Sequence, residues 1–146
     1  MMELPRESVE ALKKKIIESK KILLLAHKNP DGDTIGSALA MYHYLQGLAK
    51  DCDLGCFNAP AEGLHFLPGL EHLIHDIDDK RYDLIITFDS ADPKLSGMEK
   101  RCPEMFLKKE RLVNIDHHVS NLQYAGSNLV ITECASTTQV LYYLFK

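Results

Sequence analysis

Three short apolar segments constrain the fold of this chain more than any other feature of its sequence. Residues 22–26 (ILLLA), 83–89 (DLIITFD) and 111–116 (RLVNID) are rich in large aliphatic side chains that do not alternate with polar ones. Strands buried on both faces have this pattern, as the central strands of parallel sheets do. The segments therefore predict a parallel sheet that helices cover on both faces.

Helical and strand-like patterns alternate around these segments. Apolar residues follow a helical period over residues 7–19 and 34–49, and Asp33 or Thr34 is suited to cap the second helix. The alternation predicts a single α/β domain with an open, mostly parallel, five-stranded sheet and helices on both faces. We expect helices at 7–19, 34–49, 97–108 and 136–145, and strands at 22–26, 53–57, 83–89, 111–116 and 129–131.

Composition and charge narrow the kinds of molecule that this chain is expected to bind. The chain has 146 residues, a hydrophobic content of 45% and a net charge of −4, without a basic stripe that could follow duplex DNA. Small or short phosphorylated substrates suit this charge better. The apolar runs are too short to span a membrane and the N-terminal residues do not resemble a signal peptide, so we expect a cytoplasmic protein without membrane contact. The four cysteines form no C-x-x-C pair, and Cys52 and Cys56 are expected to pack as small hydrophobic side chains.

Polar side chains stand at the ends of the three apolar strands. His27 follows the first strand, Asp89 ends the second, and Asp116 ends the third with His117 and His118 directly after it. In open α/β sheets, ligands bind beyond the carboxyl ends of the strands. Carboxylate and imidazole ligands together suit Mn²⁺, with Zn²⁺ or Fe²⁺ as alternatives and Mg²⁺ less suited to histidine.

The turn at residues 28–33 (KNPDGD) adds Asp31 and Asp33 to this edge. Three carboxylates held close together resist joint ionisation, and two divalent ions would remove that cost and clamp a phosphate. Asp89 is placed to bridge such a pair. Taken alone, the turn or the His-His pair would indicate nothing more than ordinary local structure, so the prediction rests on their joint occurrence. An EF-hand loop starting at Asp31 is excluded because its twelfth position is Tyr42 rather than Glu.

With these motifs the chain resembles the DHH phosphoesterase family, which is named for the Asp-His-His at positions 116–118. Residues 27–37 (HKNPDGDTIGS), 85–92 (IITFDSAD) and 114–121 (NIDHHVSN) are similar to the first three motifs of that family. Residues 135–138 (ASTT) are similar to the segment that follows in its oligoribonuclease and cyclic-dinucleotide phosphodiesterase branch. The resemblance covers nearly the whole chain.

The resemblance implies two Mn²⁺ ions, with Mg²⁺ or another divalent ion as alternatives. The first ion would be held by His27, Asp31 and Asp89, and the second by Asp33, Asp89 and His117. Catalytic roles would go to His118, which would contact the substrate phosphate, and to Asp116, which would orient a neighbouring ligand. Asn29 and Asn121 would also contact phosphate.

The chain departs from the family pattern after its third motif. Family members carry a fourth motif, with a further metal-binding Asp, and a C-terminal domain of the DHHA1 type. Residues 1–146 are therefore interpreted as a DHH catalytic domain truncated before the fourth motif, and the second metal site would lack one ligand. If residues 132–146 normally pack against another segment, their apolar face is exposed in this chain, and a second copy could cover it in a homodimer.

These features favour a Mn²⁺-dependent phosphoesterase that hydrolyses phosphodiester or phosphomonoester bonds by two-metal water activation. Short oligonucleotides, 3′-phosphoadenosine 5′-phosphate, cyclic di-AMP and polyphosphate are the substrates that the resemblance leaves open. The alternative is a non-catalytic, regulatory DHH domain that binds nucleotide or metal. A haloacid-dehalogenase-type phosphatase is disfavoured, because His-Lys-Asn-Pro separates the strand from Asp31, and Ile35 stands where that chemistry needs Thr or Val.

Overall fold

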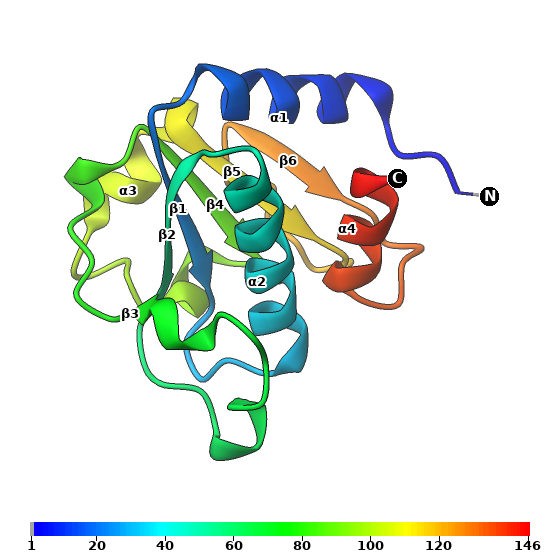
Figure 1. Ribbon diagram of the computed structural model, residues 1–146. Coiled ribbons are helices and arrows are strands. Elements are labelled where there is room, and N and C mark those ends of the chain that lie inside the picture. The colour runs from blue at the N-terminus through cyan, green and yellow to red at the C-terminus, as the bar shows by residue number, and fades with distance from the viewer. Residues whose placement is uncertain (1) are drawn as a thin grey trace.

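The three apolar segments form neighbouring strands of one parallel sheet. In a computed structural model that describes residues 2–146, β1 (Lys21–Ala26), β4 (Leu84–Phe88) and β5 (Leu112–Asp116) lie side by side (Figure 1). Over these residues the sheet has six strands in the order β3-β2-β1-β4-β5-β6, and each neighbouring pair is parallel. The remaining strands are β2 (Asp51–Cys56), β3 (Leu73–Ile74) and β6 (Ser127–Val130).

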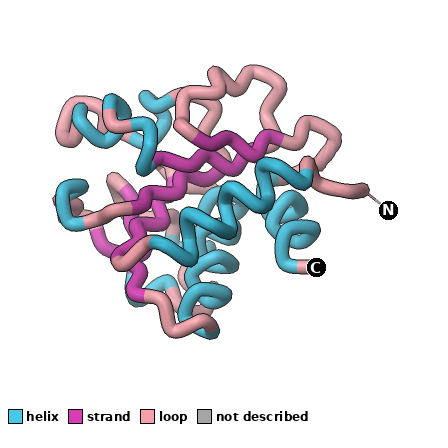
Figure 2. Tube along the Cα trace, turned by 90° about the horizontal axis from the view of Figure 1, so that it is seen from above, coloured by secondary structure: helices cyan, strands magenta, loops and turns pink. Residues whose placement is uncertain are grey.

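Alternate residues of β1 enter two different hydrophobic cores. Ile22 and Leu24 pack beneath the longer helices, whereas Leu23 and Leu25 face the opposite core. The longer helices are α1 (Arg6–Glu18), α2 (Gly32–Gly47) and α4 (Thr137–Phe145), and the short α3 (Pro103–Leu107) covers the other face. Seen from above, the strands form the middle layer between these two sets (Figure 2). The α/β class and the helices on both faces are therefore confirmed.

Three expectations from the sequence need correction. The sheet has a sixth strand, β3, whose two residues are too few to produce a recognisable pattern. Of the helix expected at 97–108, only α3 (Pro103–Leu107) is helical, because Pro103 disfavours helical geometry at the residue before it. Helix α2 is capped by Asp31 rather than by Asp33 or Thr34: the Asp31 side chain accepts hydrogen bonds from the Asp33 and Thr34 amides.

The cysteines pack as the sequence suggests. All four cysteines of residues 2–146 are unpaired and buried, and Cys52 and Cys56 both belong to the core beneath the longer helices. Across the same part of the chain, no helix has the length and apolar character needed to cross a membrane.

Candidate metal centre

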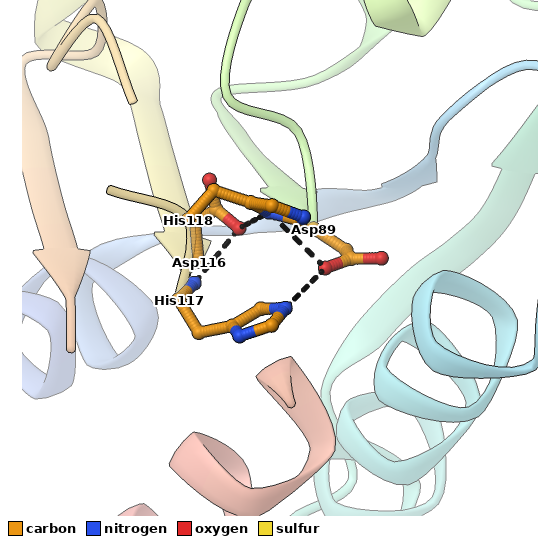
Figure 3. Close-up of side chains that lie close together, drawn as sticks. All are labelled: Asp89, Asp116, His117 and His118. Carbon is orange, nitrogen blue, oxygen red and sulfur yellow. Dashed lines mark hydrogen bonds and ion pairs between the residues drawn. The ribbon is translucent and has the colours of Figure 1, made fainter. Parts of the chain in front are cut away.

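The residues predicted at the strand ends gather at the carboxyl edge of the sheet. His27, Asp31 and Asp89 each offer one ligand atom, and these atoms lie within 4.8 Å of one another. A second group within the same distance is formed by Asp89, Asp116, His117 and His118 (Figure 3). Asp89 belongs to both groups and is the centre of the arrangement.

Asp89 has an unusual backbone and a buried side chain. Its φ of 57° lies in the left-handed region, which is rare outside glycine, and its amide donates to the Ile115 carbonyl at 3.0 Å. Such strain is typical of functional sites. Burial raises the pKa of the Asp89 carboxyl, and the Asp33 and Asp31 carboxylates nearby add to this effect. In the absence of a cation, this side chain therefore resists ionisation.

His27 and His117 present the same ring nitrogen to the carboxylates. Nδ1 of His27 contacts the Lys28 carbonyl at 2.8 Å, and Nδ1 of His117 contacts the Cys134 carbonyl at 3.2 Å. Each contact leaves Nε2 free: that of His27 lies 3.7 Å from Asp89, and that of His117 lies 3.5 Å from Asp89. A backbone carbonyl on the far nitrogen is the usual device that orients a metal-binding histidine.

Asp33 connects the centre to helix α4. Its two carboxylate oxygens accept hydrogen bonds from the Thr137 amide at 2.8 Å and the Thr138 amide at 2.9 Å. A carboxylate is favoured at this end of a helix, where amide groups lack partners within the helix. The Thr137 hydroxyl also donates to Asp89 Oδ1 at 2.9 Å. The start of α4 therefore contacts two of the predicted metal ligands.

The sequence interpretation gave no role to Thr137 or Thr138. Both belong to the ASTT segment that resembles the family, but their partners are Asp33 and Asp89, far away in the sequence. The available signal was local: Ser136 before an apolar helical pattern marks a helix start, and its hydroxyl does cap α4 by accepting from the Gln139 amide.

Asp116 is fully buried and holds His118. Its Oδ1 accepts from His118 Nδ1 at 2.7 Å and from the His117 amide at 2.8 Å. Burial lowers the pKa of His118, but the Asp116 carboxylate outweighs this and leaves the pKa above its ordinary value. In the same way, burial lowers the pKa of His27, and its contacts with Asp89 and the Lys28 carbonyl raise it above the ordinary value.

The two asparagines expected near phosphate differ in which of their groups other residues contact. The Asn29 backbone N–H donates to Asn58 Oδ1 at 2.7 Å, and the Asn29 side-chain oxygen accepts from Asn58 Nδ2 at 3.2 Å. Neither contact uses the side-chain N–H groups of Asn29, so its phosphate contact stays a prediction. Asn121 Nδ2 donates to Asn114 at 2.7 Å and to Asp116 at 2.6 Å, which uses both of its N–H groups.

The donor set suits a divalent cation. Three carboxylates and two imidazoles meet at this edge, and among the ion pairs of residues 2–146 none joins Asp31, Asp33 or Asp89 to a lysine or arginine. Within the described part of the chain histidines are the only ion-pair partners of these carboxylates, so a bound cation would relieve the repulsion between them. Carboxylate oxygens with imidazole nitrogens match Mn²⁺ and related first-row ions.

Comparison with known proteins identifies the family of this sequence. The sequence model for the DHH family, N-terminal domain, matches residues 21–146. The chain is 30% identical over 122 residues to the bifunctional oligoribonuclease and PAP phosphatase NrnA of Thermus thermophilus, covering 82% of this chain and 35% of that protein. The protein of the same name in Bacillus subtilis is 25% identical over 126 residues, covering 85% of this chain and 37% of its own length.

Two further matches, one in sequence and one in fold, extend over almost the whole chain. An uncharacterised protein of Mycoplasma genitalium is 26% identical over 147 residues, covering 99% of this chain and 44% of that protein. The crystal structure of an exopolyphosphatase-related protein from Bacteroides fragilis has the same fold, with a TM-score of 0.83 at 23% identity, and the match covers 97% of this chain and 44% of that one. The chain thus spans less than half the length of these relatives.

Replacing Thr137 by valine tests the contact between α4 and Asp89. The substitution keeps the side-chain shape but removes the hydroxyl that donates to a buried carboxylate, so we expect a loss of about 2 kcal/mol in the free energy of unfolding. Urea denaturation of the metal-free protein measures it. Thr138→Val is the matched control, since among residues 2–146 the hydroxyl of Thr138 hydrogen-bonds to Ser136 alone, and it should change stability by less than about 0.5 kcal/mol. Equal losses in the two variants would contradict the assignment.

The raised pKa values predict how the stability of the metal-free protein depends on pH. A raised pKa means that the folded state binds the proton more tightly, so His27 and His118 stabilise the fold below about pH 6.5. This stability is lost as the pH rises through the raised values, and ionisation of Asp89 acts in the same direction. In the presence of a chelator, the free energy of unfolding should fall as the pH rises from roughly 6 to 8, and it should fall by less in His27→Asn. A stability that rises over this range would refute the prediction.

Proposed function

The chain belongs to the DHH family, N-terminal domain, and from this premise we propose that it is a metal-dependent phosphoesterase of short oligonucleotides or small nucleotides. The observation that carries the proposal is the convergence of Asp31, Asp33 and Asp89 with two imidazoles at one edge of the sheet. The relatives in Thermus thermophilus and Bacillus subtilis bear the names oligoribonuclease and PAP phosphatase, and both names denote hydrolysis of a phosphate ester.

Two Mn²⁺ ions are the proposed cofactor. His27, Asp31 and Asp89 would hold one ion, and Asp33, Asp89 and His117 the other. When bound, such a pair supplies Lewis acidity toward a phosphate and lowers the pKa of water. Asp33 already accepts two hydrogen bonds from α4, so we expect its ion to bind more weakly than the ion beside Asp31.

His118 is the proposed catalytic residue beside these ions. Asp116 occupies Nδ1 of its ring, and this leaves Nε2 for a substrate oxygen. The raised pKa of His118 favours the protonated ring, which stabilises negative charge as it develops on a phosphate. We assign Asp116 to orienting this ring rather than to binding metal, because the residue is fully buried and its oxygens accept from His118, the His117 amide and Asn121.

A hydrolysis assay with bis-p-nitrophenyl phosphate and Mn²⁺ tests the proposal. Asp89→Asn should reduce turnover by a factor on the order of 100 or more, since it removes the charge shared by both proposed sites. Asparagine tolerates the left-handed backbone at this position, so the fold should persist. Asp76→Ala, at a fully exposed carboxylate, should leave turnover unchanged. A folded, metal-loaded wild-type protein without turnover would favour a non-catalytic module that binds nucleotide or metal.

Calorimetric titration with Mn²⁺ tests the two sites separately. We expect one tighter and one weaker binding event, and Asp31→Asn should weaken the tighter one while Asp33→Asn weakens the other. Asp31 also caps α2 and Asp33 caps α4, so each variant needs a check of its unfolding midpoint. Two equally tight events, or none, would count against this arrangement.

A further inference from the structure

A group of buried polar side chains is connected to Asp116 through Asn121. Thr87 on β4, Asn114 on β5 and Tyr124 in the loop after β5 are each less than a tenth exposed. We call these three residues the Asn114 cluster. Burial of polar groups is unfavourable unless each finds a hydrogen-bond partner, so their contacts show what this cluster holds in place.

The contacts within the cluster show which group donates and which accepts in each hydrogen bond. The Thr87 hydroxyl donates to the Val113 carbonyl at 3.2 Å, so in the 2.8 Å contact between Thr87 and Tyr124 the tyrosine hydroxyl is the donor. Burial raises the pKa of Tyr124, which keeps that hydroxyl protonated. Asn114 Nδ2 has the Ser90 carbonyl and the Thr87 and Tyr124 oxygens as acceptors at 3.0–3.1 Å, and its two N–H groups are shared among these three. The Asn114 amide therefore has one orientation, which leaves Oδ1 as its free acceptor.

This acceptor begins a chain of hydrogen bonds that ends at the metal centre. Asn114 Oδ1 accepts from Asn121 Nδ2 at 2.7 Å, and the other N–H of Asn121 donates to Asp116 Oδ2 at 2.6 Å. The second oxygen of Asp116, Oδ1, accepts from His118 Nδ1 at 2.7 Å. His118 is the first member with a substantially exposed ring, at 44% of its side-chain surface.

We propose that the Asn114 cluster is a set of positioning residues that, through Asn121 and Asp116, keeps the Nδ1–H of His118 on Asp116 and turns Nε2 toward the substrate, so that the protonated ring donates from Nε2 and the neutral ring is the Nδ1–H tautomer. This inference rests on the proposed function, in which His118 contacts a phosphate. It assigns Asn121 to positioning rather than to phosphate contact, because both of its N–H groups are used within the protein.

The chemistry of the cluster supports a positioning role over simple packing. Valine and phenylalanine would fill the volumes of Thr87 and Tyr124 without any need for partners, and apolar replacement of paired polar groups is often nearly neutral for stability. Polar side chains at these positions instead specify one orientation for Asn114, and through it for Asn121. An imidazole can present either ring nitrogen, and Asp116 selects between them only while its own carboxylate is fixed.

Asn121→Ala and Tyr124→Phe test this proposal against Tyr82→Phe. Tyr82 is also a buried side chain, and the control removes its hydroxyl, which donates to Asp53 Oδ2 at 2.7 Å outside the cluster. The first readout is the ring ¹⁵N spectrum of His118 in the metal-free protein at alkaline pH, which distinguishes the two neutral tautomers. The second is kcat and KM with Mn²⁺ and bis-p-nitrophenyl phosphate, beside the Kd for Mn²⁺ from calorimetry.

We expect Asn121→Ala to shift His118 away from the Nδ1–H tautomer and to lower kcat roughly tenfold or more, with KM and the Kd for Mn²⁺ within about twofold of wild type. Tyr124→Phe should cause a smaller change of the same kind, and Tyr82→Phe none. An unchanged tautomer and kcat in folded Asn121→Ala would overturn the proposal, as would a fall in kcat that follows a loss of Mn²⁺ affinity.

The ring ¹⁵N spectrum of His118 tests the positioning role independently of the proposed phosphoesterase activity. If wild type shows no turnover, the proposed phosphoesterase activity fails, and a tautomer shift in Asn121→Ala still supports positioning while an unchanged tautomer refutes it. If Asn121→Ala does not fold, the spectrum of Tyr124→Phe decides, because this variant keeps the ring that fills the core.

Discussion

The close approach of carboxylates around Asp89 is the constraint on which the arrangement of this molecule depends. A parallel sheet delivers the ends of β1, β4 and β5 to one edge, and that edge carries acidic side chains that repel one another. The described residues provide no lysine or arginine partner for Asp31, Asp33 or Asp89, so histidines and amide groups stabilise them. Each acidic side chain is therefore held by its surroundings before any cation binds.

Helix starts provide much of this support. Asp31 caps α2 through the Asp33 and Thr34 amides, and Asp33 in turn accepts from the first amides of α4. Both carboxylates thus stabilise the fold as well as being proposed to bind metal. Asp33 uses both of its oxygens on α4 amides, so a cation there must share them, whereas both amides that bind Asp31 donate to Oδ1 and leave Oδ2 for a cation. Metal affinity at Asp33 and the stability of α4 are consequently linked in this fold.

The sequence predicts the sheet and the ligand types, but it does not predict the contacts that orient them. Unbroken apolar segments identify β1, β4 and β5, and a polar residue at the end of each strand indicates the edge where ligands gather. The contact between Thr137 and Asp33 joins residues 104 positions apart, and no local pattern encodes it. Helix α3 is shorter than the helix expected at 97–108, because Pro103 disfavours helical geometry at the residue before it.

The two oxygens of Asp89 face different surroundings, and this difference follows from its backbone. Oδ2 lies near His27 on the side of α2, whereas Oδ1 lies near His117 and accepts from Thr137 on the side of α4. A residue in the left-handed region turns sharply away from its strand, and the amide bond to Ile115 keeps that turn fixed. The strained backbone thus places one carboxylate between two helices, so a shift of either helix would alter the surroundings of both proposed ions.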